Sequence, residues 1–322
     1  MGKVYVTRKI PDPGLNLLRE SGHEVVVSEK DGVLTREELL EALRGDSYDA
    51  VLSLLTDKID GEVYDAAPNA KIWANYAVGF GNLNLDDAKE RGITVTNTPG
   101  VLTDTVAEYA VALLLAVAKR IPEADRFTKE LKYEGWAPEL FLGADLKGKT
   151  LGVVGAGRIG TAMAMKAARA FEMSVIYYDV KPNETLENEL GATYKENVDD
   201  VMKEADFISV HVPLLDSTKH LISRERMQMM KPTAFLINTS RGPVVDENAL
   251  VELLRDGTIR AAGIDVYEEE PKLAHGLPEL ANAVTTPHIA SATEETRGKM
   301  SEMAARNIVE FLAGNTPPNP VT

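Results

Sequence analysis

The chain has 322 residues, a length that fits two domains of ordinary size better than one. Its formal net charge of −15 argues against a nucleic-acid surface and against attraction to anionic membranes, since both require a basic patch. The sequence contains no cysteine, which excludes disulfides, thiolate metal sites and cysteine nucleophiles, and no metal site is predicted.

Strand-like and helix-like segments alternate through the first hundred residues. This alternation predicts parallel strands joined by crossover helices. The first ten residues form a strand-like run that includes lysine and arginine, so they do not resemble a signal peptide. The strand candidates are residues 4–6, 25–28, 50–54, 72–75 and 94–96, and helical patterns include residues 36–43 and 85–90.

The sequence Asn-Thr-Pro-Gly at residues 97–100 breaks the alternation and predicts a hinge. Proline disfavours the helical state before it, and glycine tolerates unusual dihedral angles. A long apolar helix, residues 103–120, is expected next. Its longest apolar stretch, residues 106–118, is too short to span a bilayer and therefore predicts a buried helix.

A second alternating series follows and ends at another expected hinge, Thr-Thr-Pro-His at residues 285–288. The last helical run, residues 294–312, lies beyond that hinge and could return to the first domain. The proline-rich residues 317–320 are expected to form an exposed tail. The strand candidates of this series are residues 151–154, 175–179, 207–210, 234–238 and 262–265.

These patterns predict an α/β fold with two Rossmann-like domains, each built on a parallel sheet. A flavodoxin-like substrate domain is expected to comprise residues 1–99 plus 290–322. A dinucleotide-binding domain, residues 100–289, is expected to be inserted in it. The ligand cleft is expected at the two hinges.

Residues 155–160 read Gly-Ala-Gly-Arg-Ile-Gly, a dinucleotide-binding pattern placed between a buried strand and a helix. Gly155 permits a tight turn, Gly157 lets the backbone approach a pyrophosphate, and Gly160 allows the helix to pack closely on the strand. The helix N-terminus adds free N–H groups and a positive dipole for the anion. A merely structural glycine-rich turn would not need all of these features together.

Asp179 lies nineteen residues after Gly160, at the end of the next strand, where an acidic residue binds the hydroxyl groups of an adenosine ribose. A carboxylate there also repels the 2′-phosphate of NADP, so NAD(H) is the preferred cofactor. Lys181, two residues later, could offset this repulsion, which leaves NADP(H) possible.

Reduction of a 2-keto acid needs a proton donor near the keto oxygen and cationic or N–H groups on the carboxylate. Histidine is the natural donor near neutral pH. His288 lies in the second hinge, while His211 ends a strand where it could line the cofactor site. Arg241 and the glutamates at 268–270 follow strand ends, where ligands bind in such sheets. A surface arginine and a solvated acidic turn are the plain alternatives, and spacing alone does not decide between them.

Four ordered motifs resemble the consecutive signatures of D-isomer-specific 2-hydroxyacid dehydrogenases. They are residues 155–160, Asn-Thr-Ser-Arg-Gly at 238–242, Asp-Val-Tyr-Glu-Glu-Glu-Pro at 265–271 and Pro-His-Ile-Ala-Ser at 287–291. The resemblance covers nearly the whole chain. Within that family the chain is most similar to glyoxylate/hydroxypyruvate reductases, through residues 54–57, 77–79, 102–108 and the region around Trp136.

The resemblance implies a catalytic trio. His288 would donate the proton to the keto oxygen. Glu270 would pair with His288 and favour its charged form. Arg241 would bind the substrate carboxylate and the keto oxygen.

The same match implies the substrate and cofactor contacts. Backbone N–H groups of Val78 and Gly79 would hold the carboxylate. Leu54 and Trp136 would shape the pocket, and Trp136 could come from a neighbouring subunit. Relatives with an uncharged or basic residue in place of Asp179 prefer NADP. The cofactor residues that match are Gly155, Gly157, Arg158, Ile159, Gly160, Thr161, Asp179, Val180, Lys181, Thr239, Ser240, Arg241 and Asp265.

The predicted function is NAD(P)H-dependent reduction of glyoxylate to glycolate, and of hydroxypyruvate to D-glycerate. A phosphoglycerate or D-lactate dehydrogenase activity is the nearest alternative, and a co-repressor that senses NAD(H) is a more distant one. The expected partner is a small 2-keto acid, with no nucleic acid and no membrane. The apolar helix at 103–120 exceeds the needs of one domain's core, so it is expected to form the interface of a homodimer. The protein is expected in the cytoplasm, which the absence of cysteine fits.

Overall fold

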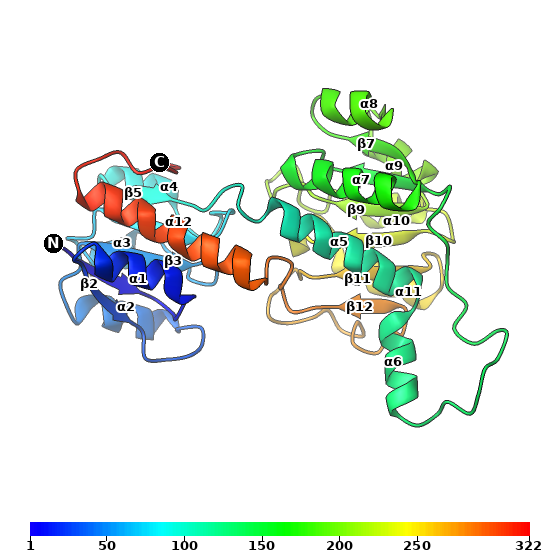
Figure 1. Ribbon diagram of the computed structural model, residues 1–322, viewed down its shortest axis with the longest axis horizontal. Coiled ribbons are helices and arrows are strands. Elements are labelled where there is room, and N and C mark those ends of the chain that lie inside the picture. The colour runs from blue at the N-terminus through cyan, green and yellow to red at the C-terminus, as the bar shows by residue number, and fades with distance from the viewer. The chain divides into compact units, whose positions relative to one another are not determined.

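The computed structural model describes residues 1–322. The chain forms two compact units, one made of Met1–Leu102 with Ala292–Thr322 and the other of Thr103–Ser291 (Figure 1). Each unit contains one sheet of parallel strands flanked by helices. This confirms the predicted α/β fold with two parallel, Rossmann-like sheets.

The sheet of the first unit has five parallel strands in the order β2-β1-β3-β4-β5. This is the flavodoxin-like order, in which the strand sequence reverses between β1 and β3. The strands are β1 (Lys3–Val6), β2 (Glu24–Val27), β3 (Ala50–Leu54), β4 (Ile72–Tyr76) and β5 (Thr94–Thr96). The helices are α1 (Asp12–Glu20), α2 (Arg36–Arg44), α3 (Gly61–Ala66), α4 (Leu85–Glu90) and α12 (Glu294–Leu312).

The last helix, α12, belongs to the first unit and packs on α1 (Figure 1). Gly14 of α1 lies so close to Ser301 of α12 that a Cβ at Gly14 would overlap the Ser301 carbonyl. The Gly14 N–H donates to Ser301 Oγ at 2.8 Å, and Ser301 Oγ donates to Pro11 O at 2.6 Å. The return of the chain to this unit therefore depends on a glycine and a hydroxyl at one helix crossing.

The proline-rich C-terminus is largely exposed, as the sequence predicted, but its backbone is paired. Pro318 and Pro320 are exposed, while Pro317 is buried. The Val321 N–H donates to Val95 O at 2.8 Å, and Pro320 forms an antiparallel bridge with Thr96. An edge strand leaves backbone groups without partners, and the tail pairs with those of β5. Composition did not predict this pairing because it carries no information on that edge.

The sheet of the second unit has seven parallel strands in the order β12-β11-β10-β9-β6-β7-β8. The strand sequence reverses between β6 and β9, as in dinucleotide-binding sheets. The strands are β6 (Thr150–Val154), β7 (Ser174–Tyr178), β8 (Thr193–Tyr194), β9 (Phe207–Val210), β10 (Phe235–Asn238), β11 (Ala261–Ile264) and β12 (Ala283–Thr285). The α-helices are α5 (Thr103–Ala118), α6 (Ile121–Lys129), α7 (Arg158–Phe171), α8 (Glu184–Leu190), α9 (Val198–Glu204), α10 (Arg224–Gln228) and α11 (Glu247–Arg255), with a 3-10 turn, η1, at Gly242–Val244.

The apolar helix α5 ends two residues before the predicted boundary. Arg120 takes a left-handed conformation with φ of 57°, and a new helix, α6, begins at Ile121 with Pro122 in its first turn. Proline is compatible with a first helical turn but not with a helix interior, so it separates the two helices. The segment after α6 has no regular structure before β6, and its exposed large hydrophobic residues are Leu131, Tyr133, Trp136, Leu140 and Leu142.

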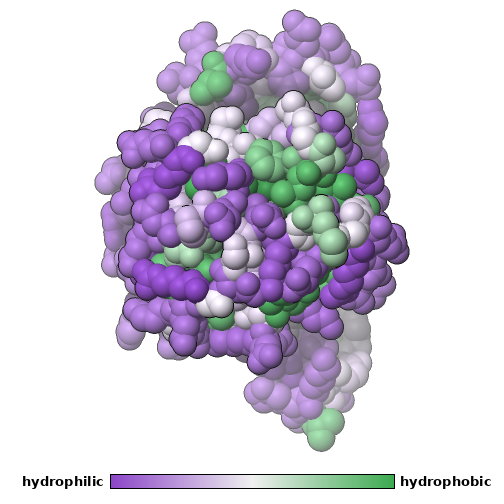
Figure 2. Space-filling view, turned by 90° about the vertical axis from the view of Figure 1, so that its left-hand side faces the viewer, coloured by the Kyte–Doolittle hydropathy of each residue, from purple (hydrophilic) through white to green (hydrophobic).

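The surface of the first unit is mostly hydrophilic on the face shown in Figure 2, where a few hydrophobic patches interrupt the polar residues. This agrees with the acidic composition of the chain. None of the helices combines the length and the apolar character that crossing a membrane requires.

Candidate active site

The glycine-rich turn joins β6 to α7 and needs each of its glycines for a separate reason. Gly155 has φ of +97°, and a Cβ there would lie 2.7 Å from Val212 N. A Cβ at Gly160 would overlap the carbonyl oxygen of Gly155. A Cβ at Gly157, in contrast, would meet no atom within 4 Å. Gly157 is therefore not required by packing, and its open space is what the close approach of a ligand would need.

The N-terminus of α7 offers free donors. Gly157 caps the helix without a side-chain hydrogen bond, and the first backbone bond of the turn runs from Thr161 N to Gly157 O at 2.9 Å. The N–H groups of Arg158, Ile159 and Gly160 precede that bond. Such groups, together with the helix dipole, bind phosphate anions. Thr161 Oγ1 donates to Ala156 O at 3.1 Å, so its hydroxyl stabilises the turn.

Asp179 follows β7 and lies against the same turn. Its two carboxylate oxygens accept from Ala156 N and Val180 N, both at 2.7 Å. Val180 and Lys181 are exposed beside it. The glycine turn, the free amides and this carboxylate are the parts that a dinucleotide needs, so the residues fit NAD(H).

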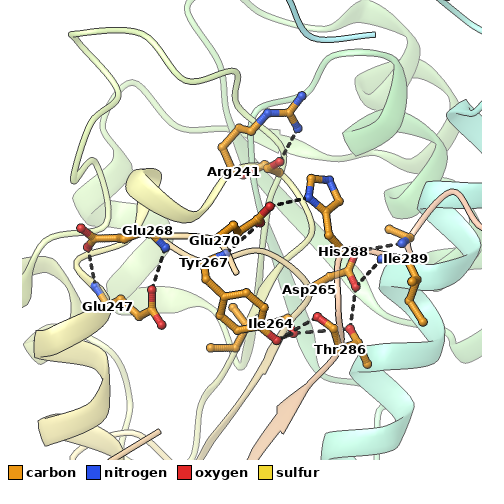
Figure 3. Close-up of polar contacts among 12 residues, drawn as sticks. Arg241, Glu247, Ile264, Asp265, Tyr267, Glu268, Glu270, Thr286, His288 and Ile289 are labelled. Atoms are coloured by element: carbon orange, nitrogen blue, oxygen red, sulfur yellow. Dashed lines mark hydrogen bonds and ion pairs between the residues drawn. The ribbon is translucent and has the colours of Figure 1, made fainter. Parts of the chain in front are cut away.

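Three neighbouring strands of the second unit, β10, β11 and β12, end in loops that carry the predicted catalytic residues. Arg241 follows β10, Glu270 follows β11 and His288 follows β12. Because carboxyl ends of parallel strands meet at one edge of a sheet, residues separated in sequence are placed together. Figure 3 shows these three side chains converging.

Glu270 and His288 form the central contact of the cluster. His288 Nδ1 lies 2.9 Å from Glu270 Oε2, and the Tyr267 N–H donates to Glu270 Oε1 at 3.1 Å (Figure 3). Burial alone would raise the pKa of Glu270, but the hydrogen bond from His288 and the charge of Arg241 outweigh it, and the pKa lies below its usual value. Glu270 is therefore an anion that orients the imidazole and leaves Nε2 free.

Arg241 is largely buried, which lowers the pKa of its guanidinium, while the charge of Glu270 opposes that effect. Its Nη1 donates to Ser240 O at 2.6 Å, and no carboxylate forms an ion pair with it. Asn238 fixes this loop by donating to Arg241 O at 3.1 Å. Thr239 Oγ1 is buried without a partner. The loop thus presents a cation whose remaining N–H donors can bind an anionic ligand.

Asp265 holds the turn that carries His288. Its Oδ1 accepts from Thr286 Oγ1 at 2.7 Å and from Ile289 N at 2.9 Å, and its Oδ2 accepts from Ala290 N at 2.8 Å (Figure 3). His288 has φ of 54°, a left-handed conformation that a side chain disfavours. The carboxylate, predicted to lie near the nicotinamide, therefore also supports the backbone of His288.

Two further residues support the cluster, and the sequence analysis missed both. A Cβ at Gly242 would overlap the Tyr267 carbonyl, so the Arg241 loop lies directly on the Glu270 loop. Glu247, a buried residue, accepts from the Glu268 N–H at 2.7 Å, and Glu268 Oε1 accepts from the Glu247 N–H at 2.9 Å. Gly242 could have been found from its place in the motif at 238–242. Glu247 lies outside every motif and gave no signal.

The expected carboxylate-binding residues belong to the first unit. Leu54 ends β3, and Val78 and Gly79 follow β4, so they lie at the carboxyl edge of that sheet. All three are partly buried. The N–H groups of Val78 and Gly79 donate to no acceptor within the chain. Two adjacent free amides can bind an anion.

The remaining sequence candidates lie apart from the cluster. Trp136 is 84% exposed, on the segment between α6 and β6. His211 hydrogen-bonds Ser209 at 2.8 Å, and His220 pairs with Glu268 at 3.0 Å. Of the five histidines, only His288 pairs with Glu270.

Comparison with known proteins identifies the family. Residues 111–290 match the family model described as the NAD binding domain of D-isomer specific 2-hydroxyacid dehydrogenases. A glyoxylate reductase of Thermofilum pendens is 49% identical over 318 residues, which cover 98% of this chain and 93% of the relative. The chain belongs to the D-isomer-specific 2-hydroxyacid dehydrogenases. This confirms the resemblance carried by the four motifs.

Solved structures agree with this assignment. The dehydrogenase matches the crystal structure of a protein of Thermus thermophilus with a TM-score of 0.92 and 44% identity, covering 99% of this chain and 100% of the other. It matches an NADPH-dependent glyoxylate/hydroxypyruvate reductase of Sinorhizobium meliloti with a TM-score of 0.86 and 33% identity, covering 100% and 98%. The dehydrogenase is thus an NAD(P)-dependent oxidoreductase.

Proposed function

We propose that this dehydrogenase reduces glyoxylate to glycolate, and hydroxypyruvate to D-glycerate, with NADH as the preferred electron donor. The observation that carries the proposal is the 2.9 Å contact between His288 and Glu270 beside the partly buried Arg241. An oriented imidazole and a guanidinium are the groups that reduction of a 2-keto acid requires. Relatives named glyoxylate reductase match nearly the full chain, which supports this substrate.

NADH, when bound along the glycine turn, would supply the hydride that reduces the keto carbon. The N–H groups of Val78 and Gly79 hold the substrate carboxylate. Arg241 binds the carboxylate and the keto oxygen, and stabilises the negative charge that develops on that oxygen. His288 donates its Nε2 proton to the oxygen while Glu270 holds Nδ1. The balance is one keto acid, one NADH and one proton to one hydroxy acid and one NAD⁺.

We propose that the first unit is the substrate domain and the second the dinucleotide-binding domain. The glycine turn, Thr239, Ser240 and Asp265 would then lie along the cofactor. The carboxylate of Asp179 would disfavour the 2′-phosphate of NADP, so NADH is expected to be used better than NADPH. The Sinorhizobium relative is named as NADPH-dependent, and exposed Lys181 is the residue here that would permit NADPH.

The test is initial-rate oxidation of NADH and NADPH with glyoxylate, hydroxypyruvate and pyruvate side by side. We expect the highest kcat/KM for glyoxylate with NADH. A higher kcat/KM for pyruvate would assign a D-lactate type activity. Negligible turnover with all three acids would contradict the proposal and favour the phosphoglycerate or co-repressor alternatives.

We also propose that the enzyme is a homodimer in the cytoplasm, where nicotinamide nucleotides are turned over. The exposed hydrophobic residues after α6, among them Trp136 at 84% exposure, favour burial by a second copy. Trp136 would then shape the substrate pocket of the neighbouring subunit. Sedimentation at micromolar concentration should give a dimer, and Trp136→Ala should weaken it and raise the KM for glyoxylate. A wild-type monomer would refute this proposal.

A further inference from the structure

The peptide Ala77–Val78–Gly79 is held in place by two asparagine side chains. Asn75 Nδ2 donates to Gly79 O at 2.9 Å, and Asn97 Nδ2 donates to Val78 O at 2.8 Å. The Thr98 N–H donates to Ala77 O at 2.9 Å. Every carbonyl of this peptide is therefore bound from the protein side. Since the N–H and C=O of a peptide unit point in opposite directions, the free N–H groups face away from these donors.

Asn75 and its neighbour Asn82 connect this peptide to the predicted pocket wall. Asn75 is fully buried and donates to Asn82 Oδ1 at 3.2 Å. Asn82 Nδ2 donates to Leu54 O at 3.1 Å and to Asp57 O at 3.0 Å. The Asp57 carboxylate in turn accepts from the Leu54 N–H at 2.8 Å. Both backbone polar groups of Leu54 are thus fixed by the same amide network.

Asn97 is held by the C-terminal end of the chain. The Asn97 N–H donates to Asn319 O at 3.2 Å. Asn307 of α12 donates to Asn97 O at 3.3 Å and accepts from the Asn319 N–H at 3.0 Å. Asn97 is buried, with 8% exposure. A continuous set of hydrogen bonds therefore runs from the C-terminal tail through Asn97 to Val78.

We propose that Asn97 is a positioning residue for the substrate carboxylate and that residues 319–322 are part of the same device. This proposal rests on the function proposed above, in which the Val78 and Gly79 N–H groups bind the carboxylate of a small 2-oxo acid. Asn97 holds the Val78 carbonyl, so the Gly79 N–H of the same peptide unit points the other way, toward the anion, while the Thr98 N–H fixes the Val78 N–H through Ala77 O. The tail locks the backbone of Asn97. Neither Asn97 nor the tail touches the substrate.

The physical reason is the need for two aligned donors. A peptide that is free to rotate about its flanking bonds presents its N–H groups only part of the time, and it loses conformational entropy when a ligand binds. A peptide that is already fixed in the free enzyme does not lose this entropy on binding. A carboxylate contact made equally in the ground and transition states changes KM with little change in kcat. The predicted signature is therefore a rise in KM for the keto acid alone.

The test uses Asn97→Ala and, separately, deletion of residues 319–322 in the otherwise complete enzyme. We expect the KM for glyoxylate to rise about tenfold in each, equivalent to about 1.4 kcal/mol. The kcat and the dissociation constant of NADH should stay near the wild-type values. Because both changes act on one peptide, combining them should raise KM little beyond the larger single effect.

The matched control is Asn315→Ala, since Asn315 is also a C-terminal asparagine but is exposed and bonds only Glu310, at 2.8 Å. Its KM should equal that of the wild type. An unchanged KM in both test variants would overturn the inference. A fall in kcat and NADH affinity in step with a lower melting temperature would also overturn it, because that pattern indicates general loss of structure.

Failure of the proposed function gives a different result. If the wild-type enzyme turns over no 2-oxo acid, the function fails, and the positioning role is measured by calorimetric titration of oxalate into the enzyme with NADH. A weaker affinity for oxalate in the Asn97 variant supports the role. Equal affinity in wild type and variant, or binding to neither, contradicts it.

Discussion

The two sheet edges that carry candidate substrate contacts are built from different groups. In the second unit, charged side chains converge: Arg241, Glu270 and His288 come from the ends of three adjacent strands. In the first unit, neutral asparagines hold a backbone peptide whose N–H groups are free. The difference teaches that a charge which develops during reaction needs charged and titratable side chains, whereas a carboxylate that stays charged can also be held by fixed backbone dipoles. Substitutions of the charged side chains in the second unit should therefore change kcat. Substitutions of the asparagines in the first unit should change KM.

The largest effect is expected at His288. His288→Gln keeps a polar side chain but removes the proton donor, so kcat should fall by about 10²- to 10⁴-fold. The NADH dissociation constant, measured by fluorescence titration, should change little. His275→Gln is the control, because His275 is exposed and outside the cluster. An unchanged kcat in His288→Gln would remove this residue from the chemistry.

Glu270→Gln should have the next largest effect. Its carboxylate has a pKa below the usual value, so in the wild type it stays charged throughout the neutral range. Removing that charge weakens the contact that orients the imidazole of His288. The kcat/KM should fall by about 10- to 100-fold. An unchanged kcat/KM would mean that Glu270 acts only in packing.

Sequence motifs predicted the charged side chains at the sheet edge of the second unit well. They predicted the asparagines at the sheet edge of the first unit poorly. Arg241, Glu270 and His288 stand in recognisable motifs at strand ends, and the parallel strands follow from the alternating pattern. Asn75 and Asn82 stand in no motif, and Asn97 was noted only as part of a hinge. Their importance lies in contacts with Val78 and Leu54 that become visible only when the sheet is assembled. The pairing of the C-terminal tail with β5 was not predicted, for the same reason.

A smaller effect is expected on cofactor choice. Asp179→Ser keeps an acceptor for the Ala156 N–H but removes the charge that repels a 2′-phosphate. The ratio of kcat/KM for NADH over NADPH should fall by about tenfold, the scale of 1.4 kcal/mol. Glu184→Gln removes an exposed charge just beyond Asp179 and should leave the ratio unchanged. If the ratio of kcat/KM for NADH over NADPH is unchanged in Asp179→Ser, residues other than Asp179 determine the cofactor preference.

The last effect is on stability rather than activity, and it concerns His211, which follows β9 and lies outside the trio. Burial lowers the pKa of His211 to about 4. Between the unfolded pKa of 6.5 and this value, the unfolded chain gains a proton that the folded chain does not, so stability falls as pH falls through this window. In denaturant titrations, the free energy of unfolding should fall from pH 7 to pH 4 by about 2 kcal/mol less in His211→Asn than in the wild type. An equal fall in the free energy of unfolding of both proteins would show that protonation of His211 does not destabilise the folded state.

The account's central claim is that the imidazole held by Glu270 faces the keto oxygen of the substrate. A crystal structure of the enzyme with NAD⁺ and oxalate tests this directly. We expect His288 Nε2 within about 2.6–3.2 Å of an oxalate oxygen. Oxalate bound elsewhere, or a His288 Nε2 that faces solvent, would contradict the account.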